Sequence, residues 1–313
     1  MEKLEVELEA ALEARLSQLS LSTARALRHH DCRRCVEADD QGAGILEARS
    51  KMPDEDLADT LAAMIDLGIT YSTQGREDEA ECMKLRAMKM CSRVLGDDHP
   101  TTHIAMDNLA VTYQNQGRLK EAEELEVAAM EASSRVLGVE HAATLAIMAN
   151  LGATFSMQGL HKEAEALEIV VLEARQKTFG AEHLFTLTAM TNLAVTYESM
   201  GRCEEAEELF LHVVRVSPGV LGDDHPKILD VTANLAAMYG NQERWTEARE
   251  VFANVVRMYS SLLGERHPDT VAAATNLAYV VEKLGQDSCV SEPTEHFPIN
   301  LSVEFKVDFG LMG

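Results

Sequence analysis

The stretch HPTTHIAMDNLAVTYQNQGRLKEAEELEVAAMEASSRVLG, residues 99–138, decides the fold of this chain. Apolar residues recur at helical spacing over residues 104–113, and Gly117 follows where a helix end needs a left-handed residue. A second apolar stripe runs over residues 119–130, ahead of Gly138. The stretch therefore predicts two consecutive α-helices joined by a short turn.

The same pattern returns every 42 residues along the chain. Four residue types repeat in one register, as Gly75, Gly117, Gly159 and Gly201; Asn108, Asn150, Asn192, Asn234 and Asn276; Ala80, Ala122, Ala164, Ala206 and Ala248; and His99, His141, His183, His225 and His267. Glu243 takes the next place of the glycine series, and Gly285 the one after it. A single helix pair cannot bury both of its apolar faces, so neighbouring pairs must stack. The fold class we expect is all-α.

One repeat carries a resemblance to a known family. Its matching residues are Asn108-Leu109-Ala110, Tyr113, Gly117, Glu121-Ala122-Glu123, Leu137-Gly138 and His141. This run resembles the 42-residue tetratricopeptide repeat (TPR) of the kinesin light chain family, and the array is most similar to Met-rich repeat arrays of fungal proteins. The resemblance covers residues 57–285. It implies a right-handed superhelical TPR solenoid of stacked antiparallel helix pairs, with a concave groove for protein partners.

Three segments are expected on this basis. Residues 1–56 form an N-terminal helical segment, which includes a degenerate repeat or a cap over the open end of the array; a short coiled-coil seam is the alternative. Residues 57–285 form the array of about five 42-residue repeats and a closing helix. Residues 286–313 are a linker and a tail in which apolar residues alternate over 299–309, as in a strand with one apolar face. We expect that face to dock on the helices or to pair across a dimer.

Composition limits the class of partner. The formal net charge is −24, which repels phosphate backbones and anionic lipid surfaces, so we expect neither nucleic acid nor membrane as a partner. The N-terminus does not have the pattern of a secretory signal, and no stretch is apolar enough to span a bilayer. Six scattered cysteines do not indicate a disulfide framework, which favours the cytoplasm.

Metal and catalytic chemistry find little support in the sequence. Equivalent histidines in successive repeats lie too far apart to share an ion, so we interpret them as turn residues that bond neighbouring backbone groups. Cys32 and Cys35 have a ligand-like spacing, but a second ligand pair is missing, and we expect no metal there. No phosphate-binding loop and no nucleophile elbow occur. We therefore expect no enzyme and no cofactor.

The expected binding surface is the groove lined by the first helix of each pair. The resemblance implies that Asn108, Asn150, Asn192, Asn234 and Asn276 hold the backbone of a bound peptide, since a carboxamide offers both a donor and an acceptor. The alternative is that some of these amides satisfy backbone groups between helices. Val111, Ala153, Val195 and Glu198 lie on the same stripe, which suits an extended segment with apolar and basic side chains.

Two functions remain open from the sequence. The first is a non-enzymatic adaptor or scaffold, whose groove binds an extended peptide or a helix of a partner protein. The alternative is a sensor or regulatory module equivalent to the repeats that follow the ATPase switch of STAND-type signalling proteins. A nucleotide-binding segment beside the array would distinguish the module from the adaptor.

Overall fold

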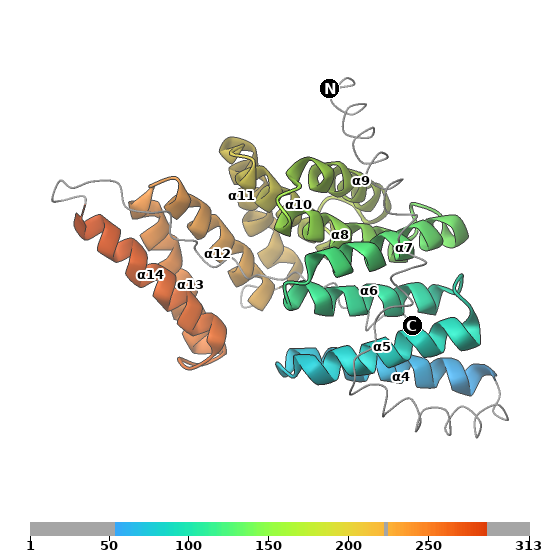
Figure 1. Cartoon of the computed structure of the whole chain (residues 1–313). Coiled ribbons are helices and arrows are strands. Elements are labelled where there is room, and N and C mark those ends of the chain that lie inside the picture. The colour runs from blue at the N-terminus through green and yellow to red at the C-terminus, as the bar shows by residue number, and fades with distance from the viewer. Residues whose placement is uncertain (1–53, 222–224, 287–313) are drawn as a thin grey trace. The chain divides into compact units, whose positions relative to one another are not determined.

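The computed structural model of the chain describes residues 54–221 and 225–286, and every regular element in these ranges is an α-helix (Figure 1). The described residues fall into two compact units that divide after Val171. Our expectations for residues 1–53, including Cys32 and Cys35, and for the alternating tail lie outside the described residues. The expected all-α class of stacked helix pairs is confirmed.

The first unit is built of consecutive helix pairs. Its helices are α4 (Asp54–Thr73), α5 (Glu77–Leu95), α6 (Pro100–Asn115), α7 (Leu119–Leu137), α8 (Ala142–Met157) and the first part of α9 (His161–Phe179). From α4 to α8, each helix packs on its neighbours in sequence. The first helices also contact each other, α4 with α6 and α6 with α8. Consecutive pairs therefore contact each other mainly through a second helix and the next first helix, with smaller contacts between first helices.

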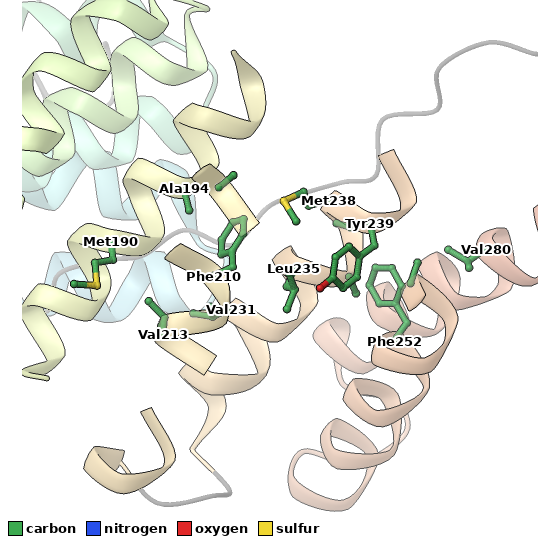
Figure 2. Packing of buried hydrophobic residues seen from close by; sticks show 14 of the residues in the cluster. Met190, Ala194, Phe210, Val213, Val231, Leu235, Met238, Tyr239, Phe252 and Val280 are labelled. Carbon is green, nitrogen blue, oxygen red and sulfur yellow. The ribbon is translucent and has the colours of Figure 1, made fainter. Parts of the chain in front are cut away.

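The second unit repeats this arrangement. It contains the end of α9, then α10 (Leu184–Ser199), α11 (Cys203–Leu221), α12 (Pro226–Asn241), α13 (Trp245–Leu262) and α14 (Pro268–Gln286). Here too the first helices touch, α10 with α12 and α12 with α14. One apolar cluster joins these helices, with Phe210, Met238, Phe252 and Val280 fully buried or nearly so (Figure 2).

Small residues set how closely the helices of a pair approach. The repeated alanines of the second helices, Ala80, Ala122, Ala164, Ala206 and Ala248, are all 0% exposed. Larger side chains at these places would push apart two helices that are already packed at interior density. The alanine series therefore allows the two helices of each pair to approach closely.

The repeated histidines begin the first helices. In each of the five, Nδ1 accepts a hydrogen bond from the backbone N–H two residues later, at 3.2–3.4 Å. This bond satisfies one of the N–H groups that a helix start leaves without a partner. The prediction that these histidines bond neighbouring backbone is confirmed.

The turn inside each pair needs a residue in the left-handed region. Gly201 has φ +77°, and its N–H donates to Glu198 O at 2.9 Å, while Arg202 N–H donates to Tyr197 O at 2.9 Å. These bonds close the end of the first helix. Glu243 takes the same place one repeat later, with φ 61°. It is the one non-glycine residue with positive φ among the described residues.

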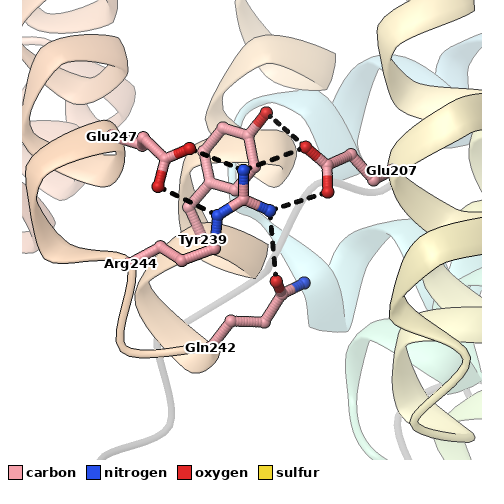
Figure 3. A network of polar contacts seen from close by, with 5 residues as sticks. All are labelled: Glu207, Tyr239, Gln242, Arg244 and Glu247. Atoms are coloured by element: carbon pink, nitrogen blue, oxygen red, sulfur yellow. Dashed lines mark hydrogen bonds and ion pairs between the residues drawn. The ribbon is translucent and has the colours of Figure 1, made fainter.

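An arginine beside this turn connects consecutive pairs. Arg244 lies over the Tyr239 ring, 4.1 Å from its centroid, and pairs with Glu247 at 2.6 Å (Figure 3). It also pairs with Glu207 of the preceding second helix at 2.7 Å, and this arginine holds the pKa of the Glu207 carboxyl below its usual value. In the first unit, Arg118 likewise lies over the Tyr113 ring, 4.0 Å from its centroid, and forms an ion pair with Glu81 at 2.9 Å.

The left-handed turn position predicts opposite changes in stability for two substitutions. Gly201→Ala should lower the free energy of unfolding by about 1 kcal/mol, because an L residue is strained at positive φ. Glu243→Gly should raise it by up to about 1 kcal/mol for the same reason, reduced by the extra freedom of glycine in the unfolded chain. Urea unfolding of both variants tests this. Equal signs for the two changes would contradict it.

Candidate functional site

A stripe of side chains runs along the first helices of the first unit. We call it the first-helix face. On α6 it comprises Ile104, Asn108, Val111 and Asn115, spaced so that they lie on one side of a helix. On α8 it comprises Asn150, Ala153 and Met157. These residues are half-buried, except that Met157 is 54% exposed. The face combines amide and apolar side chains.

The second unit has an equivalent face. Its residues are Asn192, Val195 and Ser199 on α10, Asn234, Ala237 and Asn241 on α12, and Asn276, Tyr279 and Lys283 on α14. The side chains of this face are not equally buried. Asn234 and Ala237 are buried at 3% and 1% exposure, whereas Asn192, Val195 and Asn276 are half-buried. Equivalent positions are therefore unequally accessible to a ligand.

The five repeated asparagines have different surroundings. Asn108 Nδ2 donates to Ile104 O of its own helix at 3.0 Å, and Asn150 Nδ2 donates to Asp107 Oδ2 of the preceding first helix at 2.9 Å. Asn234 Oδ1 is buried without a hydrogen-bond partner. Asn192 and Asn276 make no side-chain hydrogen bond among the described residues, so their carboxamides are the ones free to meet a ligand.

A layer of buried polar residues lies beneath this face in the first unit. Lys84 of α5 is 3% exposed, and its Nζ donates to Thr112 Oγ1 at 2.8 Å and to Ser72 Oγ at 3.1 Å. Glu126 of α7, 42 residues later, is 0% exposed and accepts from Thr154 Oγ1 at 2.6 Å. Both residues thus connect a second helix to the first helix of the next pair.

Two carboxyls of this layer are close enough to influence each other. Burial raises the pKa of Asp107 to about 7, although the Asn150 hydrogen bond and the Lys84 charge oppose the rise. Burial also raises the pKa of Glu126 well above its usual value, and the Asp107 charge adds to that rise. Gln114 Nε2 donates to Glu126 Oε1 at 3.0 Å. The two buried carboxyls therefore bind protons more tightly than exposed carboxyls do.

The expected groove acid, Glu198, is not an open carboxylate. Its Oε1 accepts from Asn241 Nδ2 at 2.7 Å, and its Oε2 is buried without a partner. Burial raises the pKa of this carboxyl, against the effect of the Asn241 bond. At the equivalent place in the first unit, Gln114 Nε2 donates to Asn150 O at 3.1 Å. A glutamate can make such a donation only when it is protonated.

Sequence reasoning missed the buried polar layer, although a signal for it exists. In the 42-residue register, the position of Lys84 is followed by Glu126, Glu168, Phe210 and Phe252. The two phenylalanines mark this position as interior, which implies that the three charged residues before them are interior as well. Two in-register glycines support this, because a Cβ on Gly68 would lie 2.6 Å from Lys84 Cγ and one on Gly152 would lie 3.2 Å from Glu168 Cγ.

Metal sites, membrane-spanning helices and disulfides each have requirements that can be compared with the described part of the chain. There, no group of three or more His, Cys, Asp or Glu side chains could hold a metal ion. None of the described helices combines the length and apolar character that crossing a bilayer requires. The cysteines of these ranges, Cys82, Cys91 and Cys203, are free thiols, and burial raises the pKa of Cys91 to about 11.

Comparison with known families agrees with this architecture. Two tetratricopeptide repeat profiles match, one over residues 101–169 and 220–288 and the other over residues 60–101 and 186–227. Together they cover more than half of the chain, which therefore belongs to the tetratricopeptide repeat family. Members of this family are generally scaffolds for protein interactions, and no catalytic family matches these residues. No curated protein matches the chain.

The chain is also similar to several solved structures of repeat proteins. The chain is similar to a putative kinesin light chain with nearly identical TPR-like repeats from Podospora anserina, at 27% identity and a TM-score of 0.53, over 65% of this chain and 97% of that one. A second crystal structure of that protein gives 26% identity, a TM-score of 0.54, and coverage of 65% and 96%. The apo quorum sensor NprR from B. thuringiensis shares the fold at 13% identity and a TM-score of 0.55, over 89% and 72%.

The unequal asparagines give a matched test. Asn150→Ala should lower the free energy of unfolding by about 1–3 kcal/mol, because it leaves a buried Asp107 oxygen without its donor. Asn192→Ala should change it by no more than about 0.5 kcal/mol, since no hydrogen bond is lost. Chemical denaturation of the two variants distinguishes a structural amide from a free one. Equal losses would contradict the distinction.

The buried carboxyl of Asp107 predicts that the free energy of unfolding depends on pH. Because the folded-state pKa of Asp107 is raised, its protonation stabilises the fold fully below pH 4 or so, and this contribution is lost as the pH rises to about 7. Asp107→Asn keeps a neutral acceptor for Asn150 and should raise the free energy of unfolding at pH 8 by roughly 2–4 kcal/mol, with little effect at low pH. Urea unfolding across pH 4–8 measures this.

The control is Asp66→Asn, which makes the same charge change at an exposed position of α4. This variant should show the same dependence of the free energy of unfolding on pH as the parent. If Asp107→Asn also leaves this dependence unchanged, the raised pKa of Asp107 is wrong.

Proposed function

We propose that this chain is a non-enzymatic adaptor that binds an extended segment of a partner protein along the first-helix face. The observation that carries the proposal is the row of accessible apolar side chains on successive first helices, flanked on α6 by amides. Asn108, Val111 and Asn115 on α6 are followed by Ala153 and Met157 on α8. Extended peptides present backbone donors and acceptors at regular intervals, which such a repeating face can match.

The chemistry of the face favours apolar and basic ligands. Val111 and Ala153 are half-buried and Met157 is 54% exposed, so they offer contact area to an apolar side chain. The formal net charge of −24 favours the approach of Lys and Arg side chains. Exposed methionines adapt their shape to different apolar partners. An acidic segment would meet repulsion without a compensating basic group on this stripe.

The family supports a binding role rather than a catalytic one. Tetratricopeptide repeats cover more than half of the chain, and the similar Podospora protein is described as a putative kinesin light chain. The raised-pKa carboxyls Asp107 and Glu126 are fully enclosed, so they are not placed to transfer protons to a substrate. An adaptor role therefore explains the accessible side chains of the first unit, and no reaction needs to be assigned to them.

Two labelled ten-residue peptides test the proposal, one alternating Leu with Lys and the other alternating Leu with Glu. The Lys peptide should bind the parent at least about tenfold more tightly than the Glu peptide, and its affinity should fall with added salt. Val111→Arg places a bulky cation on the first-helix face and should weaken binding of the Lys peptide by about tenfold or more. Fluorescence anisotropy measures both effects.

Val139→Arg is the matched control, because it makes the same charge change at a 50% exposed valine in the turn between α7 and α8. It should leave the affinity within about twofold of the parent. An equal loss in both variants would show that the peptide responds to net charge alone, and the proposed face would be wrong. Circular dichroism confirms that each variant is folded.

A further inference from the structure

The last described helix, α14, begins as the first helix of a further pair. His267 Nδ1 accepts from Asp269 N–H at 3.4 Å, and Thr270 Oγ1 donates to Gly264 O at 2.9 Å. Thr186 makes the same bond to Gly180 O at the start of α10, at 2.8 Å. One side of α14 packs on the preceding helices, with Val280 0% exposed. By register and by capping, α14 should be followed by a second helix.

A second apolar side of α14 is left uncovered within the described residues. We call it the open face. It comprises Val271, Ala274, Ala278 and Val281, which lie on one side of the helix. Both valines are 50% exposed, and both alanines are exposed. The helix therefore has two apolar sides, the buried side with Val280 and the open face, which is more apolar surface than a helix covered on one side only needs.

The preceding first helix shows what such a face normally contacts. Leu229, Ala236 and Tyr239 of α12 stand 42 residues before Val271, Ala278 and Val281. They are 2%, 0% and 8% exposed, and α12 packs on its second helix α13. The open face is therefore the surface that a second helix covers in a complete pair.

The sequence after α14 disfavours such a second helix. Residues 287–304 stand where α13 would recur one repeat later. Pro293 and Pro298 fall on the places of Val251 and Val256, inside that helix. A proline in a helix interior removes a hydrogen bond and clashes with the preceding turn. An element other than a continuous helix would then have to cover the open face of α14 and complete the pair.

We propose that residues 299–309 of this same chain lie along the open face of α14 and complete its burial. This segment alternates apolar with polar residues, so one side of an extended chain presents Ile299, Leu301, Val303, Phe305, Val307 and Phe309. Alternate side chains of an extended segment are about 6.6 Å apart, so three of them span the roughly 15 Å between Val271 and Val281. The aromatic rings fill the space left by the small residues of the open face.

The length of the chain permits this docking. Residues 287–298 separate the end of α14 from the apolar segment and can extend to about 40 Å. The helix itself is 19 residues, or about 28 Å, long. The segment can therefore reach any part of the open face without strain, and its attachment to α14 raises its effective concentration there to the millimolar range.

A second copy of the chain is a weaker candidate for the occupant. A stable dimer buries about 800 Å² on each partner. Two half-exposed valines and two alanines offer much less apolar surface than this requirement. An intrachain segment needs no such area, because it does not lose the translational freedom that two separate molecules lose on association.

Amide hydrogen exchange on the full-length chain tests the proposal. Phe305→Ser with Phe309→Ser should speed exchange in α14 by about tenfold or more, because the covering rings are lost. Val271→Asp with Val281→Asp should speed exchange in residues 299–309 by a similar factor. Combining the two double changes should add little to either alone, since both break the same contact.

Matched controls make the same chemical changes on the other sides. Glu304→Ser with Asp308→Ser alters the polar side of the segment, and Ala272→Asp alters an exposed position of α14 outside the open face. Both should leave exchange within about twofold of the parent. Unchanged exchange in α14 after loss of both rings would overturn the proposal. Protection of α14 that grows with protein concentration would also overturn it, and would assign the open face to a second copy.

Discussion

The stacking of helix pairs depends on one residue in each second helix that lies against the first helix of the next pair. In the first unit this residue is Lys84 or Glu126, hydrogen-bonded to Thr112 or Thr154. In the second unit the same place holds Phe210 or Phe252, in an apolar cluster with Met238 and Val280. Apolar burial tolerates small adjustments, whereas a buried polar contact is costly when its partner is lost. The two units therefore meet one geometric requirement with different chemistry.

This difference extends to the surface where a ligand would bind. In the first unit, the polar layer takes up the donor of Asn150, and burial raises the pKa of both Asp107 and Glu126. For Asn192 of the second unit, the residue 43 positions earlier is Ala149, whose side chain has no acceptor. Asn150 is thus structural, whereas Asn192, at the same place in the repeat, is available to a ligand. A repeated residue has a repeated role only where its neighbours repeat as well.

The end of the array shows the same dependence on neighbours. Val271 and Val281 occupy places that are interior in a complete pair, and they are half exposed because no second helix follows α14 in the described residues. The sequence beyond α14 contains Pro293 and Pro298, and proline disfavours the interior of a helix. An apolar segment follows these prolines, so the chain carries both an uncovered surface and a stretch able to cover it. A repeat array needs such a capping device wherever its stacking stops.

The sequence by itself determined the helix pairs, their 42-residue period, the histidine caps and the glycine turns, because each depends on residues close together in the chain. It also determined the face on which the asparagines lie, since helical spacing fixes that. Only the tertiary structure decided that Asn150 meets Asp107 and that Lys84 and Glu126 are interior. Those contacts join residues 28 to 43 positions apart. They depend on how far each helix rotates against the next pair, and a single repeat does not encode that rotation.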